Sequence, residues 1–204
     1  KAYEGMKKNA RPGGIMAKAG YEHNTSKGGG LEYYIDKGYV PYPLSNKKYG
    51  YHMDGTMQTL EYSYQDWCLA QLAKNLGKQS DYELFMKRAG NYKNVFDASI
   101  GWMRTKNIDG KWHEPFDILH QGQGFVESNA VQATWFVPHD MQGLFNLMGG
   151  KEKAAKKLNQ QFQISHPHNF VSLNFKSDSF STKGNFVPKK EVIKGSLYHA
   201  GEKD

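Results

Sequence analysis

"GTMQTLEYSYQDWCLAQLAKNLGK", residues 55–78, is the clearest periodic stretch of this 204-residue chain and decides its fold class. Its apolar side chains recur at helical spacing, which predicts one long helix with one wide apolar face. These side chains are Met57, Leu60, Tyr64, Trp67, Cys68, Leu72 and Leu76. Asp54 is the expected N-cap of this helix and Gly77 its expected C-cap.

The stretch that follows, residues 80–97, predicts a second helix. Ser80 and Glu83 stand in the register of a capping box at its start. Its apolar residues also suit a helix, namely Tyr82, Phe85, Met86, Tyr92, Val95 and Phe96. Two long helices joined by a short turn form an antiparallel hairpin, which is the unit from which we expect the chain to be built.

The rest of the chain predicts shorter helices separated by long loops rich in aromatic residues. The helical segments are expected at residues 1–10, 31–40, 127–136, 141–150 and 151–163. Residues 99–117 differ, because their alternating aromatics and Asp109-Gly110 predict a hairpin-like loop. No element is predicted for the polar residues 166–204. The expected fold class is therefore mainly α, as a single domain over residues 1–204.

Composition excludes some classes of protein. The formal net charge is +7, but the lysines are scattered and mixed with acids, as in residues 151–157, so we expect no nucleic-acid partner. No apolar run approaches the ~20 residues that span a bilayer, so we expect no membrane partner. Aromatics make up 14% of the residues, which suits either a core or a sugar-binding cleft. The single cysteine, Cys68, rules out an internal disulfide.

The candidate for acid–base chemistry is Glu127, in "GFVESNAVQATWFVPHD" at residues 124–140. Glycoside hydrolysis needs a carboxylic acid to protonate the departing oxygen, and such an acid sits among apolar and amide groups. The same position also suits an acid that only stabilises a helix N-terminus. Glu61 and Asp66 are rival acids, and Asp140 is explained as a helix N-cap. The residues alone leave these alternatives open.

Several long motifs occur in order, and together they resemble the catalytic domain of glycoside hydrolase family 92. They are "GYVPYP" (38–43), "TLEYSYQDWCLAQLAKNLGK" (59–78), "FMKRAGNYKNVFDASIGWMR" (85–104), "KWHEPFD" (111–117) and "ESNAVQATWFVPHDMQGLFNLMGG" (127–150). The likeness runs from about Ala17 to Phe162. Members of this family are calcium-dependent, exo-acting α-mannosidases that invert the anomeric centre.

The resemblance implies a partial (α/α)6 toroid built of helical hairpins, and an α-mannosidase that acts on α-1,2 linkages in a mannose-containing glycan. It implies that Glu127 is the general acid and that Asn129, Gln132 and Trp135 shape the substrate pocket. It also implies a calcium cofactor whose ligands lie mostly outside this chain. The location that it implies is periplasmic or secreted.

The chain departs from the family pattern in two ways. Ser128, Val131 and Ala133 stand where the family usually has Gly, Trp and Tyr, and Ala98 replaces a proline, which leaves the linkage preference open. We see neither the N-terminal β-sandwich of the family nor the C-terminal part of the toroid that carries the base. We therefore expect an internal fragment that is weak or inactive alone and associates through exposed helix faces.

Two alternatives from other classes remain. The first is a non-catalytic carbohydrate-binding or structural fragment, which predicts that a change at Glu127 has no effect on any activity. The second is a toroid glycosidase that acts on another sugar, because a fold does not determine a substrate.

Overall fold

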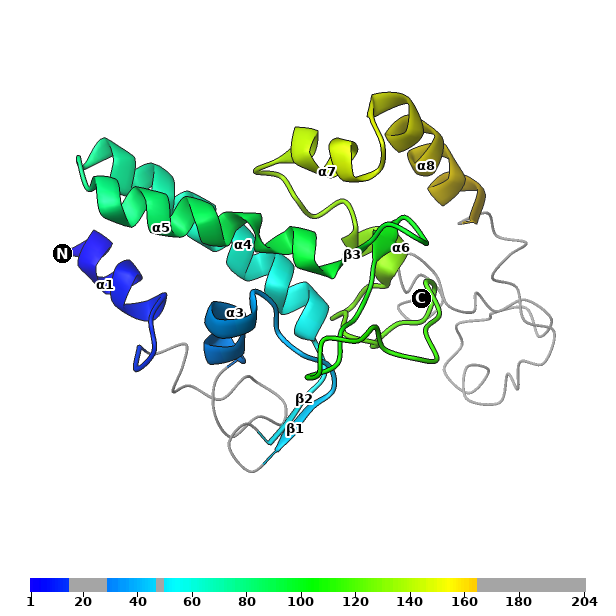
Figure 1. Ribbon diagram of the computed structural model, residues 1–204, viewed down its shortest axis with the longest axis horizontal. Coiled ribbons are helices and arrows are strands. Elements are labelled where there is room, and N and C mark those ends of the chain that lie inside the picture. The colour runs from blue at the N-terminus through cyan, green and yellow to red at the C-terminus, as the bar shows by residue number, and fades with distance from the viewer. Residues whose placement is uncertain (15–28, 47–49, 165–204) are drawn as a thin grey trace, which may run out of the picture.

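The computed structural model describes residues 1–14, 29–46 and 50–164, and this part of the chain is mainly helical (Figure 1). The helices are α1 (Ala2–Asn9), α3 (Leu31–Lys37), α4 (Gly55–Asn75), α5 (Gln79–Ala89), the 3-10 helix η1 (Gly90–Val95), α6 (Ala130–Ala133), α7 (Met141–Leu147) and α8 (Lys151–Ile164). The strands are β1 (Leu44–Asn46), β2 (Gly50–His52), β3 (Phe96–Asp97) and β4 (Trp102–Met103). The expected mainly α class is confirmed, whereas residues 166–204 lie outside the described part.

The antiparallel hairpin of α4 and α5 lies at the centre of the helical arrangement (Figure 1). Figure 1 shows α1 and α3 on one side of this hairpin, and α7 and α8 on the other. Near the end of the hairpin, α1 contributes Tyr3 to a cluster of buried residues with Leu69 and Ala73 of α4 and Phe85 of α5. The predicted helical hairpin is therefore confirmed, but its second helix is shorter than expected: α5 ends at Ala89, the 3-10 helix η1 continues to Val95, and Phe96–Asp97 form β3.

The buried face of α4 is not the one that the apolar spacing predicts. Of the seven apolar residues in that stripe only Leu60 is buried, and Leu76 is 51% exposed. The helix instead buries a stripe of small and polar residues: Thr56, Thr59, Ser63, Asp66, Ala70 and Ala73. The hydroxyls of Thr59 and Ser63 donate to carbonyls one turn earlier, at 2.8 and 2.7 Å, so they are buried with their hydrogen bonds made. The single-face prediction is wrong for this reason.

The helix ends agree with the sequence in part. Gly38 ends α3 in the left-handed conformation at φ 76°, as expected. Gly77 is also left-handed, one residue after the C-cap of α4. The capping box predicted from Ser80 and Glu83 is wrong, because α5 begins at Gln79 and places both residues inside the helix.

The expected hairpin-like loop within residues 99–117 is confirmed, since Lys106 pairs antiparallel with Trp112 across the turn, but Trp102 and Met103 pair elsewhere. The turn at Asp109-Gly110 is present, with Gly110 at φ 86° and a bond of 2.8 Å from Asn107 N to Lys111 O. However, β4 pairs with the preceding β3, so that Asp97 lies opposite Trp102. The aromatic strand was thus correctly expected to pair, but its partner lies before it in the chain.

The largest buried cluster joins the helices to the long loop before α6. It includes Leu60 of α4, Tyr92 of η1, Met103 of β4 and Leu144 of α7. Phe125, from the loop, is only 1% exposed and lies within this cluster. The loop is therefore part of the packed structure, and its conformation is set by the core beneath it.

A buried ion pair ties four helical elements together. Arg88 of α5 donates from Nε to Oδ2 of Asp66 on α4 at 2.7 Å, and from Nη1 to the carbonyl of Ala10, after α1, at 2.8 Å. The hydroxyl of Tyr34 on α3 lies 3.0 Å from Asp66 Oδ2. Burial raises the pKa of Asp66 to about 6, although Arg88 and Tyr34 both favour the charged form.

The Asp66→Asn substitution tests this assignment through the pH dependence of stability. Because the pKa of Asp66 is raised in the folded chain, its contribution to the free energy of unfolding should fall by about 3 kcal/mol as the pH rises from about 4 to about 6. Urea unfolding of both proteins, followed by circular dichroism over this range, measures the difference. Parallel stability curves for the two proteins would show that Asp66 keeps an ordinary pKa.

Candidate active site

The loop that carries Glu127 is anchored on the first turn of α4. The amide of Met57 donates to the carbonyl of Gly124 at 2.9 Å. The hydroxyl of Thr105 donates to the carbonyl of Gln123 at 2.5 Å and lies 3.2 Å from the hydroxyl of Thr56. Amides at a helix N-terminus lack partners within the helix, so the loop carbonyl satisfies one of them.

Gly124 is required at this contact for two reasons. It has φ 90°, a conformation that L side chains rarely adopt. A Cβ atom there would also lie 2.8 Å from Thr105 Oγ1 and 3.0 Å from Thr56 Oγ1. Both the backbone conformation and the close approach therefore exclude a side chain.

We expect Gly124→Ala to lower the free energy of unfolding by about 2–4 kcal/mol, since it adds backbone strain and a clash in a packed contact. Gly122→Ala is the matched control. Gly122 has φ 87°, but no atom lies within 4 Å of a Cβ placed there, so strain alone should cost about 1–2 kcal/mol. Urea unfolding of both variants measures the two effects. Equal losses would contradict the proposed close packing at Gly124.

Glu127 is exposed and has an unusual backbone conformation. Its φ is 46°, and it is the only non-glycine residue with positive φ in the part of the chain that the structure describes. It lies between Phe125, which is buried in the core, and Asn129, which is fully buried. These two buried residues fix the loop on either side and turn the backbone so that the carboxyl group faces outward. The strain at this one position is an observation that indicates a functional site.

Removing the side chain of Glu127 tests the strain directly. The free energy of unfolding of Glu127→Gly should exceed that of Glu127→Ala by about 1 kcal/mol, because glycine adopts this conformation without steric cost. The two proteins are compared by urea unfolding. A less stable glycine variant would show that the left-handed conformation carries no strain.

The side chains of Asn129 and Gln132 form a capping box at the start of α6. Asn129 Oδ1 accepts from the amide of Gln132 at 3.1 Å, and Gln132 Oε1 accepts from the amide of Asn129 at 3.3 Å. The structure thus gives both predicted pocket residues a local structural role as the cap of α6. Their contact with substrate stays a prediction.

Trp135, the third predicted pocket residue, is half-buried after α6. Its indole ring packs edge-on against Trp102 of β4, with ring centroids 6.5 Å apart. Its Nε1 is buried and has no hydrogen-bond partner, and the same is true of Ser128 Oγ, next to Glu127. Buried polar groups in native proteins are normally paired, so these two mark positions where a partner is expected.

The three substitutions near the acid have different surroundings. Val131 is 0% exposed and Ala133 4% exposed, so both belong to the packed interior of the chain. Their smaller size relative to the family pattern therefore affects the core beneath the loop. Ser128 is only half-buried and directly follows Glu127, so it is the substitution that lies closest in the chain to the acid.

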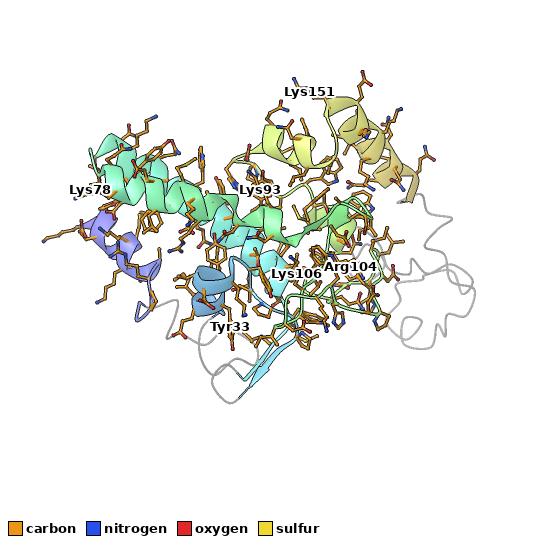
Figure 2. All side chains as sticks on the ribbon, viewed as in Figure 1. Tyr33, Lys78, Lys93, Arg104, Lys106 and Lys151 are labelled. Carbon is orange, nitrogen blue, oxygen red and sulfur yellow. The ribbon has the colours of Figure 1, made fainter. Side chains whose placement is uncertain are left out.

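Sequence reasoning missed a buried arginine that supports this loop. Arg104 is 8% exposed and donates from Nη1 to Asp97 Oδ2 at 2.9 Å, while its Nη2 pairs with Glu114. Its guanidinium group lies 5.9 Å from the ring centroid of Trp112 and 5.4 Å from that of Phe116. Figure 2 shows Arg104 within the dense group of side chains below α6. The aromatic residues on either side of Arg104 in the sequence were the pattern that could have indicated a buried arginine.

This arginine network reaches the loop through aromatic packing. The rings of Phe116 and Phe125 lie 6.4 Å apart, which links the residues around Arg104 to the core anchor of Glu127. Burial alone would raise the pKa of Asp97, but hydrogen bonds from Ser99 and Arg104 outweigh it and hold the pKa below its usual range. The carboxylate therefore stays charged and keeps Arg104 in position.

Each of the other candidate acids has contacts that give it a structural role or alter its pKa. Asp66 belongs to the buried pair with Arg88. Glu61 is half-buried, and burial raises its pKa, although a hydrogen bond with Gln65 opposes this. Asp140 caps α7, since its Oδ1 accepts from the amide of Gly143 at 2.9 Å, which confirms the N-cap interpretation.

Glu127 thus combines two features: exposure on a loop that is fixed on both sides, and a strained backbone. The sequence matches the model of the glycosyl hydrolase family 92 catalytic domain over residues 1–202, and the chain belongs to this family. The match extends beyond residues 17–162, over which the resemblance was recognised.

Solved structures of this family share its fold. An inverting mannosidase of family 92 from Bacteroides thetaiotaomicron is 35% identical, with a TM-score of 0.65, and the alignment covers 90% of this chain and 22% of that one. An α-mannosidase of the same family and organism is 34% identical, with a TM-score of 0.65 over 82% of this chain and 20% of that one. A structure of this α-mannosidase in complex with mannoimidazole is 31% identical, with a TM-score of 0.65 over 84% of this chain and 21% of that one. The likeness supports the expected partial toroid.

The sequence is also similar to a curated protein from a different source, Arthroderma benhamiae. It is described as an uncharacterized secreted glycosidase of Arthroderma benhamiae, and it is 31% identical over 158 residues, which are 64% of this chain and 20% of the relative. The chain thus spans about a fifth of the length of the relatives that it matches.

Proposed function

We propose that this chain contributes the general acid, Glu127, to an exo-acting, inverting hydrolysis of α-1,2-mannosidic linkages in glycans. The observation that carries the proposal is the strained, outward display of Glu127 between two buried residues, Phe125 and Asn129. Membership of family 92 and the mannosidase names of the similar structures support the sugar and the stereochemistry.

The chemistry asked of Glu127 is proton donation to the oxygen of the departing sugar. Donation of this kind typically contributes 10²–10⁴-fold to the rate. A rigid backbone favours it, because the carboxyl group must hold its position against the glycosidic oxygen while the bond breaks. Asn129 and Gln132 support this geometry by capping the helix that follows.

The site needs a second carboxylate. An inverting enzyme holds its two carboxyl groups roughly 6.5–9.5 Å apart, so that a water molecule fits between the base and the sugar. We propose that the base comes from a part of the enzyme outside this sequence. The exposure of Glu127 is consistent with this division, because a general acid is usually partly covered by apolar groups.

The proposal includes a calcium ion, but it assigns no ligand of that ion to a residue of this chain. Calcium takes six to eight oxygen ligands, several of them carboxylates. The described residues hold no group of three or more His, Cys, Asp or Glu side chains that fits a metal ion. On the family resemblance, we propose that the ligands of a calcium ion lie mostly outside this chain, and no step above depends on it.

The proposed location is periplasmic or secreted. The support is the description of the curated relative as a secreted glycosidase. In the described part of the chain, no helix combines the length and the apolar character needed to cross a membrane.

The decisive experiment measures mannose release from α-mannosides, with calcium and then with a chelator. This chain alone should show little or no release, whereas the protein extended beyond Asp204 should show release that Glu127→Gln lowers by about 10²–10⁴-fold. α-Glucosides in parallel test the choice of sugar. Glu61→Gln in the extended protein is the matched control and should leave release within a factor of about three.

Each part of the proposal has its own contrary result. Rapid release by the 204-residue chain would refute the missing base. Full activity of the Glu127→Gln variant would refute the acid and favour a binding or structural role for this region. Preferential release of glucose would overturn the assignment of the sugar.

A further inference from the structure

Three lysines of α8 and the turn that joins β3 to β4 line a pocket of about 370 Å³, which we call the lysine pocket. Lys153, Lys156 and Lys157 lie within about one helical turn of one another, so they share one side of α8. The turn contributes residues 98–101, and Met148, directly after α7, completes this part of the lining. Among the described residues that line the pocket, none is Asp or Glu, so the charges in its lining are positive.

Lys157 has a defined position in the lysine pocket. Its Nζ donates to the carbonyl of Ile100 at 2.9 Å and lies 4.2 Å from the ring centroid of Trp102. A Cβ atom on Gly101 would lie 2.8 Å from the same nitrogen, so the lysine lies directly against the turn. An ammonium group has three N–H donors, and the bond to Ile100 uses one of them.

The positive charge of the lysine pocket is not balanced by carboxylates. In the part of the chain that the structure describes, none of the ion pairs includes Lys153, Lys156 or Lys157. Burial lowers the pKa of Lys157, which is the effect of desolvation on a positive charge. Like charges gathered in a concave site repel one another and raise the local concentration of counter-ions. An anion in the pocket therefore offsets both the repulsion and the desolvation.

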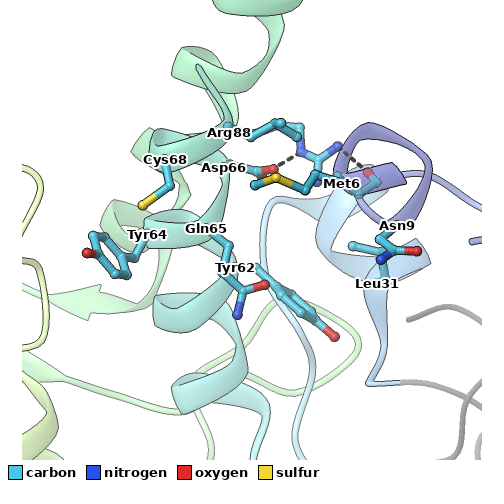
Figure 3. A pocket seen from close by; sticks show the side chains of 11 residues that line it. Met6, Asn9, Leu31, Tyr62, Tyr64, Gln65, Asp66, Cys68 and Arg88 are labelled. Carbon is cyan, nitrogen blue, oxygen red and sulfur yellow. Dashed lines mark hydrogen bonds and ion pairs between the residues drawn. The ribbon is translucent and has the colours of Figure 1, made fainter. Parts of the chain in front are cut away.

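The pocket beside Asp66 and Arg88 shows the contrast (Figure 3). There the arginine donates to a carboxylate of the same pocket at 2.7 Å, so the two charges cancel within the protein. The described lining of the lysine pocket holds no such carboxylate, so the neutralising charge has to come from a ligand.

We propose that the lysine pocket binds the phosphate group of a small ligand. A phosphate group on an ester carries about 1.5–2 negative charges near pH 7 and has three acceptor oxygens, which suits three ammonium groups. Lysine binds phosphate as a point charge and needs no fixed planar geometry. The volume of about 370 Å³ falls in the range of small-molecule sites, roughly 300–1,000 Å³, so an organic body fits beside the phosphate.

The lysine pocket adjoins the candidate active site without including it. Trp102 lies against Lys157 and packs edge-on with Trp135. Neither Glu127 nor Trp135 lines the pocket. Phosphate binding is therefore separate from glycoside hydrolysis, and its test uses no mannoside, so failure of one proposal leaves the other standing.

The experiment follows the ³¹P NMR signals of inorganic phosphate and glucose 6-phosphate as this chain is added, at about pH 7 and low salt. At least one signal should shift saturably, with a dissociation constant of about 1 mM. Tighter binding of glucose 6-phosphate identifies a phosphate ester as the source of the group, and tighter binding of inorganic phosphate identifies the free ion. The absence of a saturable shift for both overturns the proposal.

Acetate tests whether the pocket distinguishes phosphate from other anions. It carries a single negative charge, so it should displace the phosphate probe at least about tenfold less effectively than unlabelled phosphate does. Equal displacement by acetate would show general attraction of anions and overturn phosphate recognition.

A matched pair of double substitutions tests the location. Lys153→Gln with Lys156→Gln removes two charges from the pocket, whereas Lys74→Gln with Lys151→Gln removes two charges outside its lining. All four lysines are exposed, so both proteins should fold, and both have the same net charge. The pocket variant should bind phosphate at least about fivefold more weakly, and the control variant should stay within a factor of about two of the unchanged chain. Equal losses in the two variants, or no loss in the pocket variant, would overturn the site.

Discussion

The hydrogen bond from the amide of Met57 to the carbonyl of Gly124 joins the first turn of α4 to the loop that displays Glu127. Its geometry requires glycine at 124, because the hydroxyls of Thr56 and Thr105 fill the space of a side chain. The loop is therefore held by the most central helix of the structure. A carboxyl group displayed in this way is positioned by the core, although it lies on the surface.

Buried polar contacts hold α4 against its neighbours, where a stripe of apolar residues was expected to do so. The buried face of α4 carries Thr59, Ser63 and Asp66, and each has its hydrogen-bonding partner. Arg88 then joins α5 to α4 and to the end of α1, while Arg104 plays a comparable part beneath the loop. Buried polar networks of this kind specify one arrangement of helices, because every alternative leaves a charge unpaired.

The strained residue and the buried network belong to one arrangement. Phe125 enters the core beside Phe116, which lies against Arg104, and Asn129 closes the other side of the loop as a helix cap. Between these two anchors Glu127 adopts the left-handed conformation. Strain is kept at one residue because the surroundings on both sides are well packed.

Local patterns in the sequence determined the mainly α class, the helical hairpin, the glycine at the end of α3, the cap at Asp140 and the turn at Asp109-Gly110. Each depends on periodicity or on the conformational preferences of residues close together in the chain. The motifs also determined the family, since they occur in order over most of the sequence. Tertiary structure alone decided which face of α4 is buried, which strand pairs with Trp102, and how Arg88 and Arg104 are used. These features depend on partners far away in the chain, whose contacts no local pattern contains.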